Sequence, residues 1–191
     1  MTQATALLVV DMQMEMTFRT QAGRPRANLQ AEDRVADLLT AFRIAGLPVL
    51  HVHHDAPEPE SGFRRGTPGG EAMPCAMPQG DEPVFWKTGS SGFVGTGLAE
   101  HLRSIGVGRL IVVGGVAAFC VTSTVRSAAN LGFDVLVPED ALIAFAMPDR
   151  HGGDIDADVA LEVTLSSLHA GFGQVLPTSE VLADLQRATQ L

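Results

Sequence analysis

The stretch LIVVGGVAAFCVTSTVRSAANLGFDVLV, residues 110–137, decides the fold of this chain. It begins with an apolar run at 110–113, continues through a helical segment at 121–131 that Gly132 ends, and closes with a second apolar run at 135–137. A strand, a helix and a strand in this order are typical of a βαβ unit, which joins two parallel strands. The stretch therefore predicts a parallel sheet.

Strand-length apolar runs and helical segments also alternate on both sides of this unit. The predicted strands are 6–10, 49–52, 84–86, 110–113, 135–137 and 173–176. The clearest helix has apolar residues at i, i+3, i+4 and i+7, namely Val35, Leu38, Leu39 and Phe42. Further helices are predicted over 98–105 and over 121–131. Val159, Val163 and Leu168 suggest another helix over 159–168, and Thr178 could cap a last one that carries Val181, Leu182 and Leu185. Right-handed crossovers then give a three-layer α/β/α fold with a doubly wound, six-stranded, mainly parallel sheet.

The composition favours one globular domain over residues 1–191. Hydrophobic residues make up 46% of the chain and charged residues 18%, which suits a sheet buried on both faces. The net charge of -9, without a basic run, argues against nucleic acid and anionic membranes as partners. We find no long apolar segment or secretory leader, so we expect a cytoplasmic protein. Cys75 and Cys120 lack metal-knuckle spacing and are expected to be free thiols.

Residues 55–83 differ in character from the rest of the chain. They contain six prolines and five glycines and show no sustained period. We interpret them as a long loop over one edge of the sheet, of the kind that is usually functional in a compact domain. Cys75 lies inside this loop and is expected to have no chemical role.

Three polar residues stand where predicted strands end. Asp11 follows LLVV, Lys87 follows VFW, and Cys120 follows LIVVGGVAAF at the start of a helix. In an open parallel sheet the ligand site lies at the carboxyl ends of the strands, so these side chains should meet there. Lys87 is also the only lysine among thirteen basic residues, which indicates a position that needs a compact ammonium.

A thiol, a carboxylate and an ammonium together can carry out covalent hydrolysis. The helix dipole and the ammonium should lower the pKa of Cys120 and make its thiolate accessible near neutral pH. The carboxylate of Asp11 can take a proton and return it to the leaving group. Gly114 and Gly115 allow a tight turn whose amides could hold an oxyanion.

The residues also resemble a known family. The segments LLVVDMQ, FWKTGSSGFVGTGL and VVGGVAAFCVTSTVRSAANLGFDVLVPEDA are similar to the three signature blocks of the isochorismatase-like hydrolases, in the same order. The resemblance covers residues 6–175. It implies that Asp11 is the base, Lys87 the polarising cation and Cys120 the nucleophile that forms a thioester. It also implies a non-proline cis peptide between Gly115 and Val116, with the amides of Val116 and Cys120 forming the oxyanion hole.

The sequence departs from the family pattern at two places. Ala117 replaces the threonine that usually precedes the cysteine, which weakens any assignment of a specific substrate. The nicotinamidases of this superfamily bind a metal through an Asp-x-His pair, and the second ligand position here is Pro57. We therefore predict neither a metal nor another cofactor.

The histidine cluster after the second strand is the main argument for a metal site. His51 and His53 share one face of a strand and His54 lies on the other, so the three cannot converge by themselves. Packing or pocket-lining roles are favoured over a metal site, and His54 is the one expected to touch substrate. The other candidate substrate-binding residues are Gln13, Phe18, Trp86, Phe93 and Phe119, for which ordinary core packing is an equally good interpretation.

Three functions remain open at this stage. The first is a cysteine hydrolase that cleaves a C–N bond in a small amide, imide or ureido compound. The second is a metal-assisted amidase of the nicotinamidase type, and the third is a non-catalytic domain that binds a small ligand. The intact set of Asp11, Lys87 and Cys120 favours an enzyme. The resemblance also implies a homo-oligomer, a dimer or a tetramer.

Overall fold

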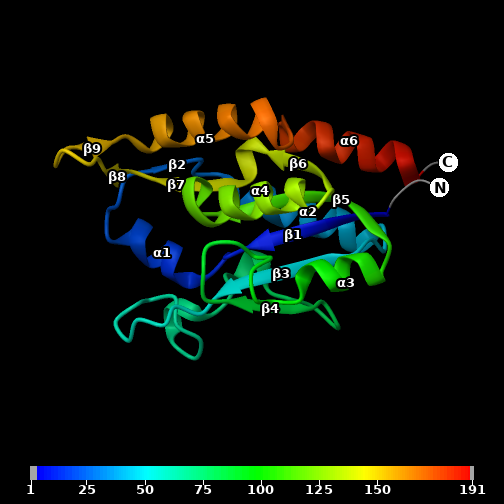
Figure 1. Ribbon diagram of the computed structural model, residues 1–191, viewed down its shortest axis with the longest axis horizontal. Helices are drawn as coiled ribbons and strands as arrows, with labels where there is room; N and C mark the ends of the chain where they lie inside the picture. Colours follow the sequence, from blue (N-terminus) through cyan, green and yellow to red (C-terminus); the bar gives the residue numbers. More distant parts are fainter. Residues whose placement is uncertain (1–3, 190–191) are drawn as a thin grey trace.

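A computed structural model describes residues 4–189 (Figure 1). Six parallel strands lie in the order β10-β6-β5-β1-β3-β4 within a single sheet. Their bounds are Ala4–Val10 for β1, Val49–His54 for β3, Val84–Lys87 for β4, Val107–Gly115 for β5, Asp134–Pro138 for β6 and Gln174–Leu176 for β10. All six predicted strands are present, and the doubly wound, mainly parallel α/β architecture is confirmed.

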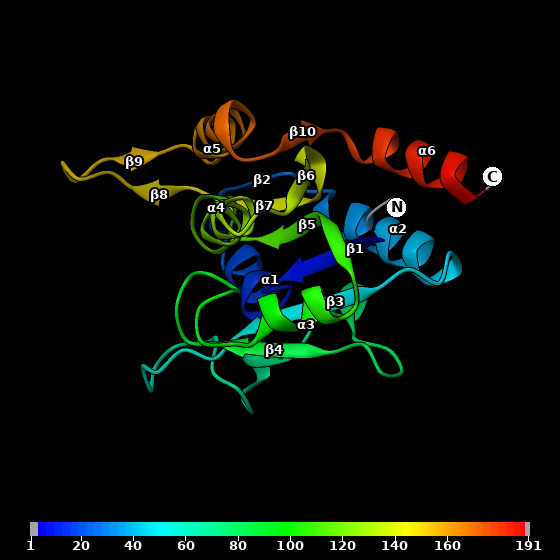
Figure 2. The same cartoon turned by 45° about the vertical axis from the view of Figure 1, so that its right-hand side comes forward.

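Four short strands were not predicted. β7 (Leu142–Phe145) pairs parallel to the carboxyl end of β5, and β2 (Arg26–Ala27) pairs antiparallel to β7. β8 (Met147–Pro148) and β9 (Asp154–Ile155) form a separate two-stranded sheet, which extends beyond the rest of the molecule at one end in both views (Figures 1 and 2). Strands of two to four residues are too short to show an alternating pattern, so periodicity could not reveal them.

Helices cover both faces of the sheet. The first layer contains α3 (Leu98–Ser104), α4 (Thr122–Asn130) and α5 (Ala157–Gly171), and the second contains α1 (Met14–Gln21), α2 (Ala31–Ile44) and α6 (Thr178–Thr189). Each layer packs on its own apolar cluster. Within residues 4–189, none of these helices has the length and apolar character needed to cross a membrane.

The central strand β1 supplies side chains to both apolar clusters. Leu8 and Val10 face the layer of α3, α4 and α5, whereas Leu7 and Val9 face the layer of α1, α2 and α6, and all four are completely buried. Burying one such side chain contributes about 1.5–3 kcal/mol. A strand buried on both faces has no reason to alternate polar and apolar residues, which explains the continuous run ALLVV.

The predicted helices are present, with three differences. The sequence did not predict α1, which begins only four residues after β1 ends. In α5, two of the apolar residues that suggested the helix, Val159 and Val163, are 55% and 65% exposed, because Leu161, Leu165 and Leu168 form the buried face. α6 begins at Thr178, so Thr178 is the first helical residue and not the residue before the helix, and both its amide and its hydroxyl donate to Asp140.

The long loop is tied to the second helix layer. It contains two short turns, η1 (Pro68–Gly70) against α1 and η2 (Pro74–Ala76) against α2. The amide of Met73 donates to the carbonyl of Met12 at 2.8 Å, and Gln13 forms an isolated bridge with Ala72. The loop therefore returns to the carboxyl end of β1, where the strand-end side chains lie.

Glu82 holds the end of this loop against the sheet and α2. Its carboxylate accepts two hydrogen bonds from Arg43 of α2, one from the amide of Gln79, and pairs with Nε2 of His51 on β3 at 2.9 Å. Burial alone would raise the pKa of Glu82, but the bonds from Arg43, Gln79 and His51 outweigh burial and lower the pKa from 4.5 to about 2.

Glu82→Gln should therefore reduce stability by about 1–3 kcal/mol at pH 7, because it removes the charge from several hydrogen bonds. A carboxylate with a depressed folded-state pKa stabilises the protein above its unfolded pKa, and this stability is lost as pH falls from about 4.5 towards 2. Urea unfolding of both proteins between pH 2.5 and 7 measures the effect.

The control is Asp134→Asn, which removes a half-exposed ion pair with Arg109 and should cost less than about 1 kcal/mol. Equal losses for the two variants, or an unchanged acid dependence in Glu82→Gln, would contradict the role assigned to Glu82.

Candidate active site

Asp11 lies immediately after β1 and adopts a left-handed backbone conformation with φ of +49°. Aspartate is one of the few non-glycine residues that tolerate this region. The Asp11 amide donates to the carbonyl of Val52 on β3 at 2.8 Å, and the residue is only 2% exposed. The carboxylate is therefore fixed and buried at the carboxyl edge of the sheet.

Cys120 is held at the same edge by the turn that follows β5. Gly114 has a φ of +114°, and a Cβ atom there would lie 2.0 Å from the carbonyl oxygen of Val10, so only glycine fits against β1. The peptide bond between Gly115 and Val116 is cis, as the resemblance implied. Residues 117–121 then form a turn of π-helix that continues into α4, which places Cys120 in the first turn of a helix.

Lys87 is the last residue of β4, and its ammonium joins the other groups. Its Nζ lies 2.7 Å from Oδ2 of Asp11, 3.1 Å from Nδ1 of His54, 3.2 Å from the carbonyl oxygen of Gly89 and 3.3 Å from Sγ of Cys120. The side chain is completely buried. The structure thus brings the three predicted catalytic side chains into direct contact around one nitrogen atom.

Asp11 and Cys120 influence the charge of each other. Burial raises the pKa of Asp11, although Lys87 opposes this shift. Burial also raises the pKa of Cys120, and the Asp11 carboxylate raises it further, to about 12, against the opposing effect of Lys87. The expectation of a thiolate accessible near neutral pH is therefore wrong for the free protein, because burial and a neighbouring anion outweigh the ammonium and the helix dipole.

His54 ends β3 and lies beside the ammonium, not in a cluster with the other histidines. Burial and the charge of Lys87 lower its pKa, so neutral imidazole accepts a hydrogen bond from Nζ. His51 binds Glu82, and His53 packs edge to face against Trp86 at 5.1 Å. The predicted separation of His54 from His51 and His53 is confirmed.

Gln13 supports the site from behind and does not line the cavity. Its side-chain amide donates to the carbonyl oxygens of His54 and Gly70, and its side-chain oxygen accepts from the amide of His54. Gln13 is completely buried. It therefore connects the end of β1 to β3 and the long loop, a packing role that the sequence left open beside substrate binding.

A cavity of about 320 Å³ opens beside the thiol. Its lining consists of Asp11, Met16, Arg19, Arg24, His54, Phe63, Val116, Phe119 and Cys120. This volume suits a small organic molecule. Of the predicted wall residues, His54 and Phe119 are in this set.

The other predicted wall residues lie elsewhere. Phe18 is 38% exposed, Trp86 packs against His53 and under the guanidinium of Arg65, and Phe93 packs against Phe133 in the core. Four other lining residues were not predicted from the sequence, namely Met16, Arg19, Arg24 and Phe63. Three of them lie in or just after α1, the helix that was not predicted, and Phe63 comes from the loop without a period.

Three possible metal ligands lie close together at the site. Asp11, His54 and Cys120 each offer one ligand atom, and these atoms lie within 4.8 Å of one another, a spacing that could hold a metal ion. The Lys87 ammonium, however, contacts all three of these groups. A second cation at their centre would meet that charge at short range, so the arrangement fits an internal ammonium better than a metal.

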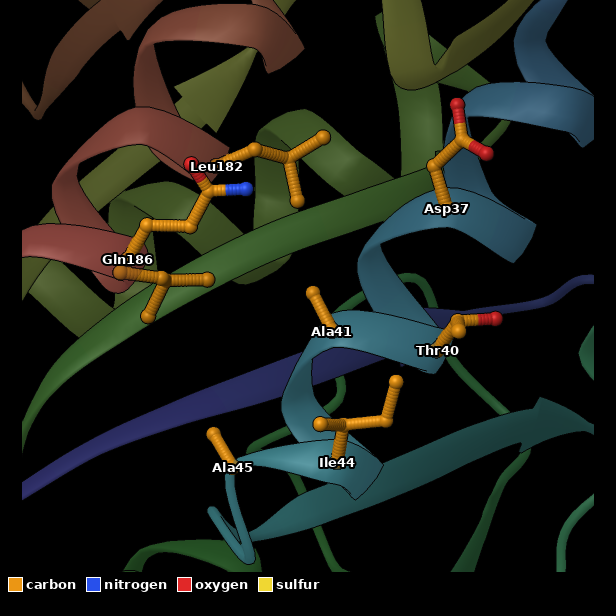
Figure 3. A pocket seen from close by; sticks show the side chains of 8 residues that line it. Asp37, Thr40, Ala41, Ile44, Ala45, Leu182 and Gln186 are labelled. Atoms are coloured by element: carbon orange, nitrogen blue, oxygen red, sulfur yellow. The ribbon is translucent and has the colours of Figure 1, made fainter. Parts of the chain in front are cut away.

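A larger groove of about 520 Å³ lies between α2 and α6 (Figure 3). In Figure 3, Ala41 and Ile44 of α2, with Ala45 directly after it, lie across from Leu182 and Gln186 of α6. α2 ends just before β3 begins, so this groove is at the amino ends of the strands. None of the described residues that line this groove is a cysteine, a histidine or a lysine, and we assign the site to the smaller cavity.

The combination of an α/β sheet with reactive side chains at its carboxyl edge places the protein among the hydrolases of this architecture. The chain belongs to the isochorismatase family, since the model of the Isochorismatase domain matches residues 5–167. It is 37% identical to an isochorismatase-family hydrolase from Chromobacterium violaceum, whose crystal structure has a TM-score of 0.91 over 96% of this chain and 94% of that one.

Two further relatives are informative about the chemistry. A cysteine hydrolase from Pseudomonas syringae pv. phaseolicola is 28% identical, with a TM-score of 0.87 over 96% of this chain and 93% of that chain. A streptothricin hydrolase of Streptomyces noursei is 36% identical over 143 residues, which are 75% of this chain and 51% of that protein.

The contacts around Lys87 predict opposite effects of two substitutions on the pKa of Cys120. Asp11→Asn removes an anion that raises this pKa, whereas Lys87→Met removes a cation that lowers it. At pH 8 we expect iodoacetamide to alkylate Cys120 about tenfold faster in Asp11→Asn than in the wild type, and about tenfold slower in Lys87→Met. Rates are measured by mass spectrometry of the Cys120 peptide.

Cys75, whose pKa burial raises to about 11, serves as the reference within each sample and should be unaffected. Equal Cys120 rates in the wild type and Lys87→Met would show that the ammonium has no electrostatic influence on the thiol.

Proposed function

We propose that this hydrolase cleaves a C–N bond in a small amide, imide or ureido compound, with Cys120 as nucleophile, Asp11 as base and Lys87 as the charge that holds them. The observation that carries the proposal is the position of the buried Nζ, 2.7 Å from Asp11 and 3.3 Å from Cys120. The cysteine hydrolase among the relatives supports a thiol nucleophile.

In the first step, the Cys120 thiol transfers its proton to Asp11, and the sulfur attacks the substrate carbonyl carbon. Oδ1 of Asp11 is suited to accept the proton, because it is buried and has no hydrogen-bond partner among the described residues. The carbonyl oxygen becomes an oxyanion, for which the amides of Val116 and Cys120 at the cavity wall are the candidate donors.

The intermediate then collapses. The C–N bond breaks, and the leaving nitrogen takes the proton from Asp11, which leaves a thioester on Cys120. Asp11 next removes a proton from a water molecule, and the resulting hydroxide adds to the thioester carbon. When the C–S bond breaks, the sulfur leaves as thiolate, the proton on Asp11 returns to it, and the free acid is released.

The raised pKa values of Asp11 and Cys120 are compatible with this sequence. A carboxylate that holds a proton more tightly than usual is a better base, and the first transfer only moves one negative charge from oxygen to sulfur. The ammonium of Lys87 contacts both the Asp11 carboxylate and the Cys120 sulfur. Its attraction for the negative charge therefore changes little when that charge moves from one group to the other. The buried ammonium therefore allows the thiolate to form when substrate has excluded water.

Cys120→Ser should reduce kcat by at least about 1000-fold without loss of the fold, because this base does not ionise an alcohol. Lys87→Arg should also lose activity, because a planar guanidinium cannot contact the side chains of Asp11, His54 and Cys120 from one point. The assays are hydrolysis of a panel of primary amides, ureido acids and cyclic imides, and acid quenching followed by mass analysis of the Cys120 peptide.

A mass adduct on Cys75 in place of Cys120, or more than a tenth of wild-type activity in Cys120→Ser, would contradict the mechanism. The circular dichroism spectrum of each variant establishes that it is folded.

Dialysis against a chelator should leave the activity unchanged, because Lys87 already supplies the cation between Asp11, His54 and Cys120. Metal analysis of the purified protein accompanies the assay. Activity that is lost on dialysis and restored by zinc or iron would favour the nicotinamidase type of chemistry instead.

A further inference from the structure

Two arginines line the cavity beside Cys120, in a protein whose net charge is -9. Arg19 belongs to α1, and Arg24 follows that helix. Burial lowers the pKa of Arg24, and the charge of Arg19 lowers it further, so the two guanidinium groups are near enough to repel each other. Placing two cations together is unfavourable unless an anion reaches them.

The two arginines differ in how their charges are balanced. Arg19 forms an ion pair with Glu15 at 2.8 Å, one helical turn earlier. Within residues 4–189, no carboxylate lies within ion-pair distance of Arg24. Asp154 and Asp156 share a separate recess with Arg24, but neither reaches that distance.

Arg24 is held in place by neutral contacts. Its Nε and Nη2 donate to the carbonyl oxygen of Ala146 at 3.2 and 3.1 Å, and its guanidinium lies over the ring of Phe145 at 5.3 Å. The amide of Ala146 in turn donates to the carbonyl of Pro25. A guanidinium has five N–H groups, and the other three of Arg24 have no hydrogen-bond partner among the residues described. Arg24 is thus positioned in advance and free to bind a ligand.

The remaining charges of the cavity cancel. The Asp11 carboxylate is paired with Lys87, Arg19 is paired with Glu15, and His54 is neutral because burial and Lys87 lower its pKa. Arg24 therefore leaves the cavity with one uncompensated positive charge. Asp11 is buried, whereas Arg24 is partly exposed, so this charge lies closer to solvent than the reacting groups do.

We propose that the substrate carries a carboxylate, which Arg24 binds while Cys120 attacks the carbonyl carbon of an amide or ureido group in the same small molecule. This inference rests on the proposed function and narrows its substrate class to anionic amides. Binding of the carboxylate by a fixed planar guanidinium would orient the scissile bond as well as add affinity.

Alkylation of Cys120 tests the charge of the cavity without any hydrolysis. Iodoacetate and iodoacetamide react with the thiolate in the same way: the C–S bond forms and iodide leaves. They differ in that iodoacetate is an anion. We expect Arg24→Gln to lower the ratio of the iodoacetate rate to the iodoacetamide rate at Cys120 about fivefold at low salt, and 0.5 M salt to reduce the wild-type ratio towards that of the variant.

Two variants serve as controls. Arg24→Lys keeps the charge and should retain the ratio within about twofold, which separates charge from loss of the bonds to Ala146. Arg109→Gln removes an exposed arginine that is paired with Asp134 and should leave the ratio unchanged. An unaltered ratio in Arg24→Gln, or the same decrease in Arg109→Gln, would overturn the proposal.

Hydrolysis provides a second test with a matched pair of amides. Succinamate has a carboxylate where butyramide has a methyl group, and kcat/KM for succinamate should exceed that for butyramide in the wild type but not in Arg24→Gln. Equal values in the wild type would overturn the proposal. If neither these two amides nor any member of the wider panel is hydrolysed, the proposed function fails, while the alkylation ratio still decides whether the cavity prefers anions.

Discussion

A primary ammonium without contact to water is the constraint on which the active site depends. A buried charge is costly unless opposite charge and hydrogen-bond acceptors surround it, and removing a partner leaves the charge uncompensated. Lys87 finds these partners in Asp11, His54, Gly89 and Cys120. The ends of β1, β3 and β4 and the start of the helix after β5 therefore meet at one point around this ammonium.

The strand register makes this meeting possible. His54 of β3 lies directly beside Lys87 of β4, and Val10 of β1 beside Val52 of β3. Because parallel strands end at the same edge, the last residues of β3 and β4 and the first residue after β1 bring their polar side chains together. Gly114 lets β5 approach β1 at this edge, since any side chain there would collide with the carbonyl of Val10. The same backbone positions thus determine both the sheet and the site.

The sequence was informative where an apolar run was long enough to mark a strand, or where a polar residue stood at the end of a predicted strand. The six parallel strands and the convergence of Asp11, Lys87 and Cys120 could be predicted, because continuous apolar runs mark strands and strand ends define an edge. The residues that line the cavity could not be predicted. Arg19 and Arg24 depend on a short helix and a two-residue strand without a usable pattern, and Phe63 reaches the cavity from a loop. The shift in the pKa of Cys120 was predicted in the wrong direction, because a sequence indicates which charged groups are neighbours but not how deeply they are buried.

The raised pKa of Cys120 also bears on how readily oxidants react with this thiol. Peroxide oxidises thiolates to sulfenic acid and then to irreversible forms, whereas a protonated thiol reacts far more slowly. With a pKa of about 12 in the free protein, the Cys120 thiol is almost entirely protonated at neutral pH. We therefore expect the resting thiol to react slowly with peroxide, and in the mechanism proposed above its sulfur becomes oxidisable only during the part of each turnover in which it is ionised.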